Sequence, residues 1–140
     1  MGQGRQENQK PMTDSYKIGV DICSIKRVEE VYERFGKRFL ERILTDAEAA
    51  YVTSSPRHLI SRLAGRFAAK EACAKALGCG IRGINWKDVE VTKKQSGEPG
   101  INLHARARAR ADKLGLQNFQ LSISHEREYA VAFVVASTAS

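Results

Sequence analysis

An acid and a base lie one helical turn apart in a long, alanine-rich stretch of the sequence. The stretch Leu63–Gly80 reads LAGRFAAKEACAKALGCG, and most of its residues are good helix formers. Glu71 and Lys75 lie four residues apart in it, so a helix places both side chains on one face. This spacing alone is typical of a surface ion pair worth a few tenths of a kcal/mol. A catalytic role for the pair depends on the groups that the rest of the chain brings beside it.

Two further groups with acid–base chemistry lie at predicted strand ends. Asp21 lies near the end of the segment Tyr16–Ile22, where a carboxylate is most often the N-cap of the next helix. The alternative is a catalytic carboxylate. His125 directly follows the segment Phe119–Ser124, where it is either a turn residue or a functional group. Spacing alone leaves both pairs of alternatives open.

Length, charge and cysteine count limit the classes of protein. The 140 residues suffice for about one domain, which we expect over 15–140, after a polar and disordered tail at residues 1–14. The 23 Lys and Arg against 16 Asp and Glu give a net charge of +7, which favours a nucleic acid, a phosphate-bearing substrate or an acidic protein as partner. The three cysteines lack metal-ligand spacing and indicate reduced thiols in the cytoplasm. No apolar run is long enough for a membrane span, and the N-terminus lacks the apolar core of a signal peptide.

The first half of the chain is predicted to be mainly helical. The predicted elements are a strand at Tyr16–Ile22 and helices over Ser24–Phe35, Lys37–Ile43 and Thr45–Ser54. The long helix follows, with Ser55 as its N-cap, Pro56 in its first turn and Gly78 at its end. Three- and four-residue spacing gives it one apolar stripe, formed by Leu59, Leu63, Phe67, Ala74 and Leu77.

The second half is predicted to be mainly β-structure. The predicted elements are strands at Trp86–Lys93, Ile101–His104, Phe119–Ser124 and Tyr129–Val135 and a helix at Ala105–Leu114. Gln95–Gly100 has the composition of a turn, and His125–Glu128 is short enough for a hairpin connection. The arginines of the predicted helix alternate with alanine and spread round its axis, which argues against a nucleic-acid groove. Together these elements predict one α+β domain.

Four segments in order along the chain carry a resemblance to one family. They read IGVDI at Ile18–Ile22, LAGRFAAKEACAKALGCGI at Leu63–Ile81, SGEPG at Ser96–Gly100, and LSISHEREYAVA at Leu121–Ala132. In these segments the chain resembles the holo-[acyl-carrier-protein] synthases, the short class of 4′-phosphopantetheinyl transferases. The resemblance implies a small antiparallel sheet wrapped around one long central helix, and a homotrimer with active sites between subunits. It also implies transfer of 4′-phosphopantetheine from coenzyme A to a serine of apo acyl carrier protein, a step that serves fatty acid biosynthesis.

The resemblance assigns the four reactive residues to one site. Asp21 and Glu71 match the metal-binding carboxylates of the family, and two carboxylates with open water positions suit Mg²⁺. Lys75 matches the lysine placed near the transferring phosphate, and His125 the histidine of the substrate cleft. The serine hydroxyl needs a base, for which Glu71 and a metal-activated water are both candidates.

The resemblance also implies two binding surfaces. Residues matching positions that contact coenzyme A are Arg57, His58, Arg66, Gly80, Pro99 and His125, although a histidine at position 58 departs from the family. Residues matching the surface that docks the acidic carrier protein are Arg27, Arg38, Phe39 and Arg42. The net charge of +7 then serves an acidic protein partner and not a nucleic acid.

Overall fold

The computed structural model describes residues 15–138, so the tail predicted at residues 1–14 lies outside the described residues. The helices are α2 (Ile25–Phe35), α3 (Lys37–Ile43), α4 (Asp46–Thr53), α5 (Leu59–Ala76) and α6 (Ala105–Leu114), with 3₁₀ turns η2 (Pro56–His58), η3 (Ile81–Gly83) and η4 (Trp86–Asp88). The strands are β1 (Tyr16–Ser24), β2 (Val89–Lys93), β3 (Pro99–Leu103), β4 (Leu116–His125) and β5 (Tyr129–Thr138). No helix within residues 15–138 is both long and apolar enough to cross a membrane.

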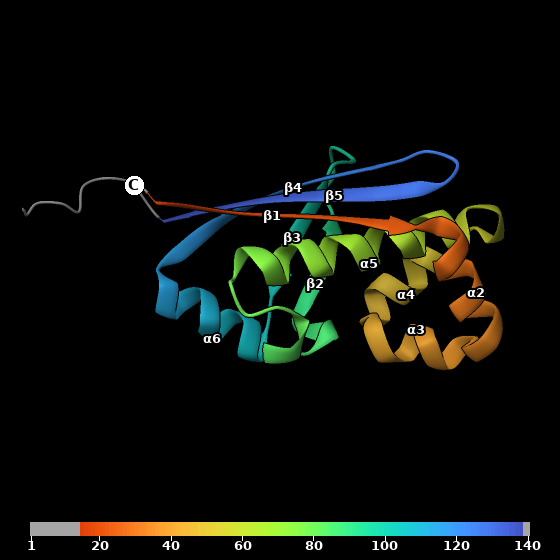
Figure 1. Cartoon of the computed structure of the whole chain (residues 1–140), viewed down its shortest axis with the longest axis horizontal. Coiled ribbons are helices and arrows are strands. Elements are labelled where there is room, and N and C mark those ends of the chain that lie inside the picture. The colour runs from red at the N-terminus through yellow and green to blue at the C-terminus, as the bar shows by residue number, and fades with distance from the viewer. Residues whose placement is uncertain (1–14, 139–140) are drawn as a thin grey trace, which may run out of the picture.

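Helix α5 lies at the centre of the molecule (Figure 1). One antiparallel sheet, with strand order β1-β5-β4, covers one side of it, and the β2–β3 hairpin packs against another. Helices α2, α3 and α4 gather at one end of this arrangement, and α6 lies at the opposite end (Figure 1). The predicted α+β class, an antiparallel sheet around one long central helix, is confirmed.

Small side chains allow the sheet to lie directly on α5. Gly19 of β1 faces the helix, and a β carbon built on it would overlap the carbonyl oxygen of Ala72 and lie 2.8 Å from the amide nitrogen of Ala76. Alternation along a strand then turns Asp21, two residues later, toward the same helix. The contact is buried and apolar, and involves Ala68, Ala72 and Ala76 from α5 and Ala132 and Val134 from β5. Helix α5 is therefore buried on more than the single predicted stripe.

Some local predictions are confirmed and others are wrong. Thr45 and Glu48 form the predicted capping box of α4, and Gly78 has the positive φ of 76° expected after a helix end. Ser55 does not cap the long helix, because its hydroxyl is bonded to the ring of His58 and a 3₁₀ turn precedes Leu59. The predicted strand at Trp86–Lys93 begins only at Val89, because Trp86–Asp88 is also a 3₁₀ turn.

A buried ion pair joins three elements to α5. Lys70 is fully buried, and its Nζ donates to Glu48 Oε1 at 2.8 Å and to the carbonyl oxygens of Trp86 and Val89. The Glu48 carboxylate also accepts the backbone N–H groups of Thr45 and Val91. All three ammonium protons therefore have acceptors, and the pair fixes α4, η4 and β2 against α5.

Candidate active site

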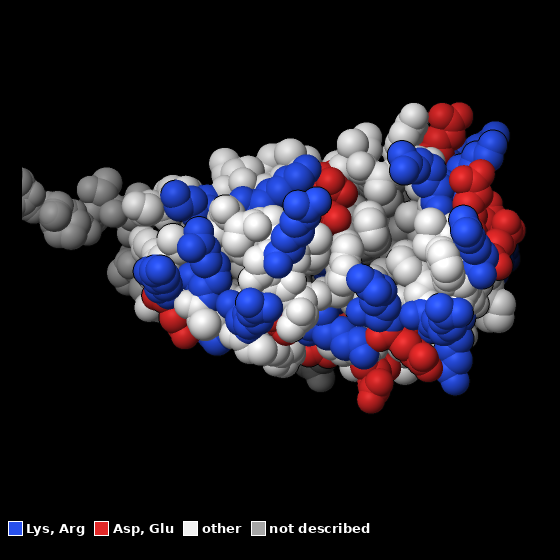
Figure 2. All heavy atoms as spheres, turned by 60° about the horizontal axis from the view of Figure 1, so that its bottom comes forward, with Lys and Arg blue, Asp and Glu red and all other residues white. Residues whose placement is uncertain are grey.

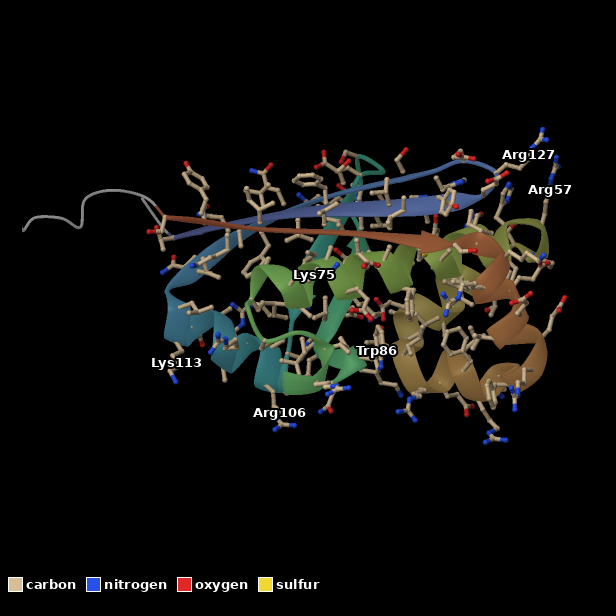
Figure 3. The ribbon with its side chains drawn as sticks, viewed as in Figure 1. Arg57, Lys75, Trp86, Arg106, Lys113 and Arg127 are labelled. Atoms are coloured by element: carbon tan, nitrogen blue, oxygen red, sulfur yellow. The ribbon has the colours of Figure 1, made fainter. Side chains whose placement is uncertain are left out.

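Asp21 and Lys75 meet where β1 crosses α5. Lys75 Nζ lies 3.2 Å from Asp21 Oδ1 and donates to the carbonyl oxygen of Val20 at 3.0 Å. Figure 3 shows Lys75 between α5 and the edge strand β1. The predicted ion pair with Glu71, four residues earlier on the helix, is wrong, because the tertiary partner Asp21 takes the ammonium group.

Asp21 does not cap the helix that follows β1. Ser24 is the N-cap of α2, and its hydroxyl accepts the backbone N–H of Arg27 at 3.2 Å. Of the two alternatives that spacing left open for Asp21, the helix N-cap is therefore wrong. Its carboxylate instead faces the residues of α5 across one cavity that Glu71 also lines.

The second carboxylate of this cavity has unusual electrostatics. Partial burial raises the pKa of Glu71, the nearby Asp21 carboxylate raises it further, and Lys75 opposes both effects. A cation shared by the two carboxylates would remove the repulsion that Asp21 exerts on ionised Glu71. Within residues 15–138 no third His, Cys, Asp or Glu joins them as a possible ligand. The donor set therefore fits a hard divalent ion that keeps several waters, as Mg²⁺ does.

The residues predicted to dock a carrier protein continue from this cavity. Arg27 and Phe39 line it together with Asp21 and Glu71. Phe39 also lines an adjoining groove with Arg38 and Arg42, both of which are exposed. The four residues thus form one surface that begins beside the carboxylates and runs along α2 and α3.

Several residues predicted to bind coenzyme A gather in a different cavity. His58, Arg66, Pro99 and His125 all line it, although they come from η2, α5, β3 and β4. Arg57 lies next to His58 but points away from the molecule at its end (Figure 3). Gly80 does not line this cavity. It has a φ of 65° in the loop after α5, and an added β carbon there would meet nothing within 4 Å.

This second cavity contains groups that the sequence did not single out. Arg62, Lys93 and Tyr51 line it, and no Asp or Glu within residues 15–138 does. Arg66 is only 9% exposed, and its Nε has no hydrogen-bond partner among the described residues. A buried cation in a cavity without carboxylates is suited to a bound anion such as phosphate. The sequence signalled Arg62 and Lys93 only by their basic character and gave no signal for Tyr51, since their meeting depends on how α4, α5 and β2 pack.

The described chain thus places its predicted catalytic residues in two places. Asp21 and Glu71 share one cavity, with Lys75 bonded to Asp21, while His125 lines the other. The two cavities have no lining residue in common.

Comparisons of the sequence with known proteins all identify the same family. The model of the 4′-phosphopantetheinyl transferase superfamily matches residues 17–134. The holo-[acyl-carrier-protein] synthase of Gloeobacter violaceus is 49% identical over 119 residues, which cover 85% of this chain and 90% of the relative.

Solved structures of the same class are also similar. The crystal structure of the Neisseria meningitidis holo-[acyl-carrier-protein] synthase has a TM-score of 0.79 at 36% identity, and the match covers 86% of this chain and 96% of that one. The Helicobacter pylori synthase in complex with coenzyme A has a TM-score of 0.75 at 38% identity, with 85% and 98% covered. The chain therefore belongs to the 4′-phosphopantetheinyl transferase superfamily, and within it to the holo-[acyl-carrier-protein] synthases, which are transferase enzymes.

Proposed function

We propose that the protein transfers the 4′-phosphopantetheine group of coenzyme A to a serine of apo acyl carrier protein, with the help of Mg²⁺. The products are holo acyl carrier protein and adenosine 3′,5′-bisphosphate, and the step serves fatty acid biosynthesis. The convergence of Asp21, Glu71 and Lys75 carries this proposal, because Asp21 and Lys75 lie 54 residues apart in the sequence and form an ion pair in the fold.

Asp21 and Glu71 would hold the magnesium ion. When bound, the ion neutralises the diphosphate of coenzyme A and polarises the phosphorus–oxygen bond that breaks. The side chain of Lys75 is 53% exposed, so its ammonium can leave Asp21 and bind a phosphate oxygen. These three residues supply the two negative charges that bind the cation and the positive charge that faces the phosphate.

The reaction moves one phosphoryl group between two oxygens. The serine oxygen forms a bond to the phosphorus that bears the pantetheine arm, and the bond from that phosphorus to the bridging oxygen breaks. Its electron pair leaves with adenosine 3′,5′-bisphosphate, and the serine proton passes to a base. Glu71, which lines the same cavity as Asp21, and a water activated by the metal are the two candidates for this base.

The cation-lined cavity would hold the nucleotide end of coenzyme A. Arg66, His58 and Pro99 line this cavity, and His125 reaches it from the end of β4. We also propose contacts from Arg57, which precedes His58 in η2, and from Gly80 after α5, although neither residue lines this cavity. The Helicobacter pylori relative was solved with coenzyme A, which supports this class of substrate.

The surface formed by Arg27, Arg38, Phe39 and Arg42 would dock the acidic carrier protein. Its position beside Asp21 and Glu71 brings the acceptor serine to the carboxylates. Elsewhere the basic charge is dispersed, since Figure 2 shows Lys and Arg scattered across the whole of one face and not in a single groove. In α6, Arg108 faces Asp112 and Arg110 donates to the carbonyl oxygen of Leu77. These engaged arginines support an acidic protein over a nucleic acid as the partner.

We further propose that the protein acts as a homotrimer in the cytoplasm. The outer face of the β1-β5-β4 sheet is apolar, with side chains 45–63% exposed at Tyr16, Ile18, Val20, Ile22, Tyr129 and Phe133. A contiguous apolar face of this kind marks a protein–protein interface. Packing of copies through it could bring the two separate cavities together between subunits. The free thiols of Cys23, Cys73 and Cys79 support a reducing compartment.

The experiment uses the full-length protein with coenzyme A, Mg²⁺ and apo acyl carrier protein. Mass spectrometry of the carrier should show the gain of one phosphopantetheine, and a chelator should abolish this gain. Light scattering should give the mass of three chains. An unchanged carrier together with salt-sensitive binding of DNA or RNA would refute the transferase assignment.

A further inference from the structure

Three cationic side chains surround one aromatic ring in the second cavity. The Cζ atoms of Arg62 and Arg66 lie 4.1 Å and 4.3 Å from the centroid of the Tyr51 ring. Lys93 Nζ lies 5.2 Å from the same centroid. The ring belongs to α4, the two arginines to α5 and the lysine to the end of β2. A cation over an aromatic face is attracted by the negative charge of the ring.

The ring replaces the carboxylates that usually hold clustered cations. Three like charges repel each other, and among the residues that the structure describes no Asp or Glu lines the cavity to neutralise them. The nearby Glu48 is already engaged by Lys70, Thr45 and Val91. A neutral ring attracts the three cations but does not neutralise them as a carboxylate would. Their positive charge therefore remains available to bind an anionic ligand.

Hydrogen bonds keep Arg62 in place, and Arg66 has a donor that no described residue engages. Arg62 Nη1 donates to the carbonyl oxygen of Tyr51 at 2.8 Å and to Ser54 Oγ at 3.0 Å, which fixes its direction. Arg66 is 91% buried and its Nε is unpartnered among the described residues. Burial lowers the pKa of Arg66, Tyr51 and the Glu48 charge oppose this shift, and the charge of Arg62 adds to it. A bound anion would accept a hydrogen bond from the buried Arg66 guanidinium and would stabilise its charged form.

The proposed function identifies which anion this is, and the inference rests on it. Coenzyme A has two anionic groups, a diphosphate and a 3′-phosphate monoester. The diphosphate reacts beside Asp21 and Glu71, in the cavity that shares no lining residue with this one. The 3′-phosphate is therefore the group left for the three cations, and its double negative charge matches them.

We propose that Tyr51 is a positioning residue, which holds Arg62, Arg66 and Lys93 around the 3′-phosphate of coenzyme A. Arg62 and Lys93 thereby join Arg66 as phosphate contacts. The ring touches the cations and not the reacting atoms, so its loss should weaken substrate binding and leave the rate of the bound complex unchanged. The loss should also depend on the 3′-phosphate.

The contribution of the 3′-phosphate to binding can be measured by comparing two nucleotides that differ only in this group. Isothermal titration should measure the affinity of the full chain for adenosine 3′,5′-bisphosphate and for adenosine 5′-monophosphate, which lacks the 3′-phosphate. The wild-type protein should prefer the bisphosphate. Tyr51→Leu should weaken binding of the bisphosphate about tenfold, because several cation–π contacts are lost together, and should change binding of the monophosphate less than twofold. Tyr51→Phe keeps the ring and should bind both nucleotides as the wild type does.

Two variants keep the test decisive if Tyr51→Leu does not fold. Lys93→Gln changes an exposed residue, and it should lower affinity for the bisphosphate severalfold and spare the monophosphate. Arg106→Gln removes an exposed arginine of α6 that points away from the cavity (Figure 3), and it should change neither affinity.

The outcomes distinguish the inference from the proposed function. Equal losses for both nucleotides, or no loss in Tyr51→Leu and Lys93→Gln, would overturn the positioning role even if the carrier protein is modified. A Tyr51-dependent preference for the bisphosphate, with no mass gain on the carrier, would keep the phosphate site and refute the transferase reaction.

Discussion

Gly19 of β1 lies against the backbone of Ala72 on α5, so closely that a β carbon on Gly19 would overlap the Ala72 carbonyl oxygen. This contact sets the distance between the edge strand and the central helix. Because Asp21 follows two residues later on the same face of β1, the contact also sets where the first carboxylate meets Glu71 and Lys75. The glycine is thus as much part of the site's construction as the charged residues are.

Gly19→Ala should force β1 away from α5. We expect the free energy of unfolding to fall by about 1–3 kcal/mol, because backbone atoms and not a flexible side chain fill the space. Chemical denaturation measures this change, with Lys17→Ala, an exposed neighbour on the same strand, as the control. Equal stability of Gly19→Ala and the control would show that the close approach is not needed.

Lys70→Met should destabilise the fold more strongly than any surface substitution. The change leaves the Glu48 carboxylate buried without its cation, a loss of about 3–5 kcal/mol. Lys94→Met removes an exposed lysine that pairs with Glu98, and it should cost less than about 1 kcal/mol. Similar unfolding curves for the two variants would contradict the structural role of the buried pair.

Glu90 should make stability depend on pH in the acid range. His104 Nε2 donates a hydrogen bond to Glu90 Oε1 at 2.9 Å and lowers the pKa of the Glu90 carboxyl group, and the Thr45 hydroxyl donates to the same carboxylate with a further lowering effect. The lowered pKa means that the unfolded chain binds more protons at acid pH, so this stabilisation is full above about pH 4.5 and is lost as the pH falls through the folded-state pKa. Glu90→Gln should therefore be less stable than the wild type near pH 7, and the difference should shrink toward pH 3. A difference that is constant with pH would refute the assignment.

Features governed by neighbouring residues could be predicted from the sequence. The capping box of Thr45 and Glu48, the end of the long helix at Gly78 and the α2–α3 break at Gly36 all depend on a few adjacent residues. The predicted hairpin after His125 is also present, between β4 and β5.

Features governed by distant residues could not be predicted from spacing. Lys75 pairs with Asp21 and not with Glu71, because β1 crosses α5 at that turn. Ser24 and not Asp21 caps α2, since β1 continues past Ile22. The Lys70–Glu48 pair and the cations around Tyr51 each join elements whose packing no local pattern encodes. Only the resemblance to a family predicted that Asp21 and Glu71 lie together, and the structure shows that both line one cavity.

Changes in the carrier-docking surface should affect the KM for acyl carrier protein and not the KM for coenzyme A. The double variant Arg27→Glu, Arg38→Glu should raise the KM for acyl carrier protein at least tenfold and leave the KM for coenzyme A within about twofold, because reversed charges repel the acidic partner. Added salt should narrow the difference between variant and wild type. Arg106→Glu with Lys113→Glu reverses two exposed charges of α6 and serves as the matched control. Equal rises in both KM values would show that these arginines do not dock the carrier.

Glu71→Gln should abolish transfer while leaving the fold intact. The amide keeps the size of the side chain and removes both the charge that binds the cation and the base. Mass spectrometry of the carrier protein measures transfer, and circular dichroism checks the fold. Turnover at the wild-type rate would exclude Glu71 from metal binding and from proton transfer.

The sharing of one divalent ion by Asp21 and Glu71 is tested most directly by crystals grown with coenzyme A and Mn²⁺ in place of Mg²⁺. Anomalous scattering at the manganese edge locates the ion without any assumption about which residues are its ligands. We expect one peak per subunit between the two carboxylates, next to the diphosphate. Carboxylates that point into separate regions, with the manganese peak elsewhere, would contradict the account.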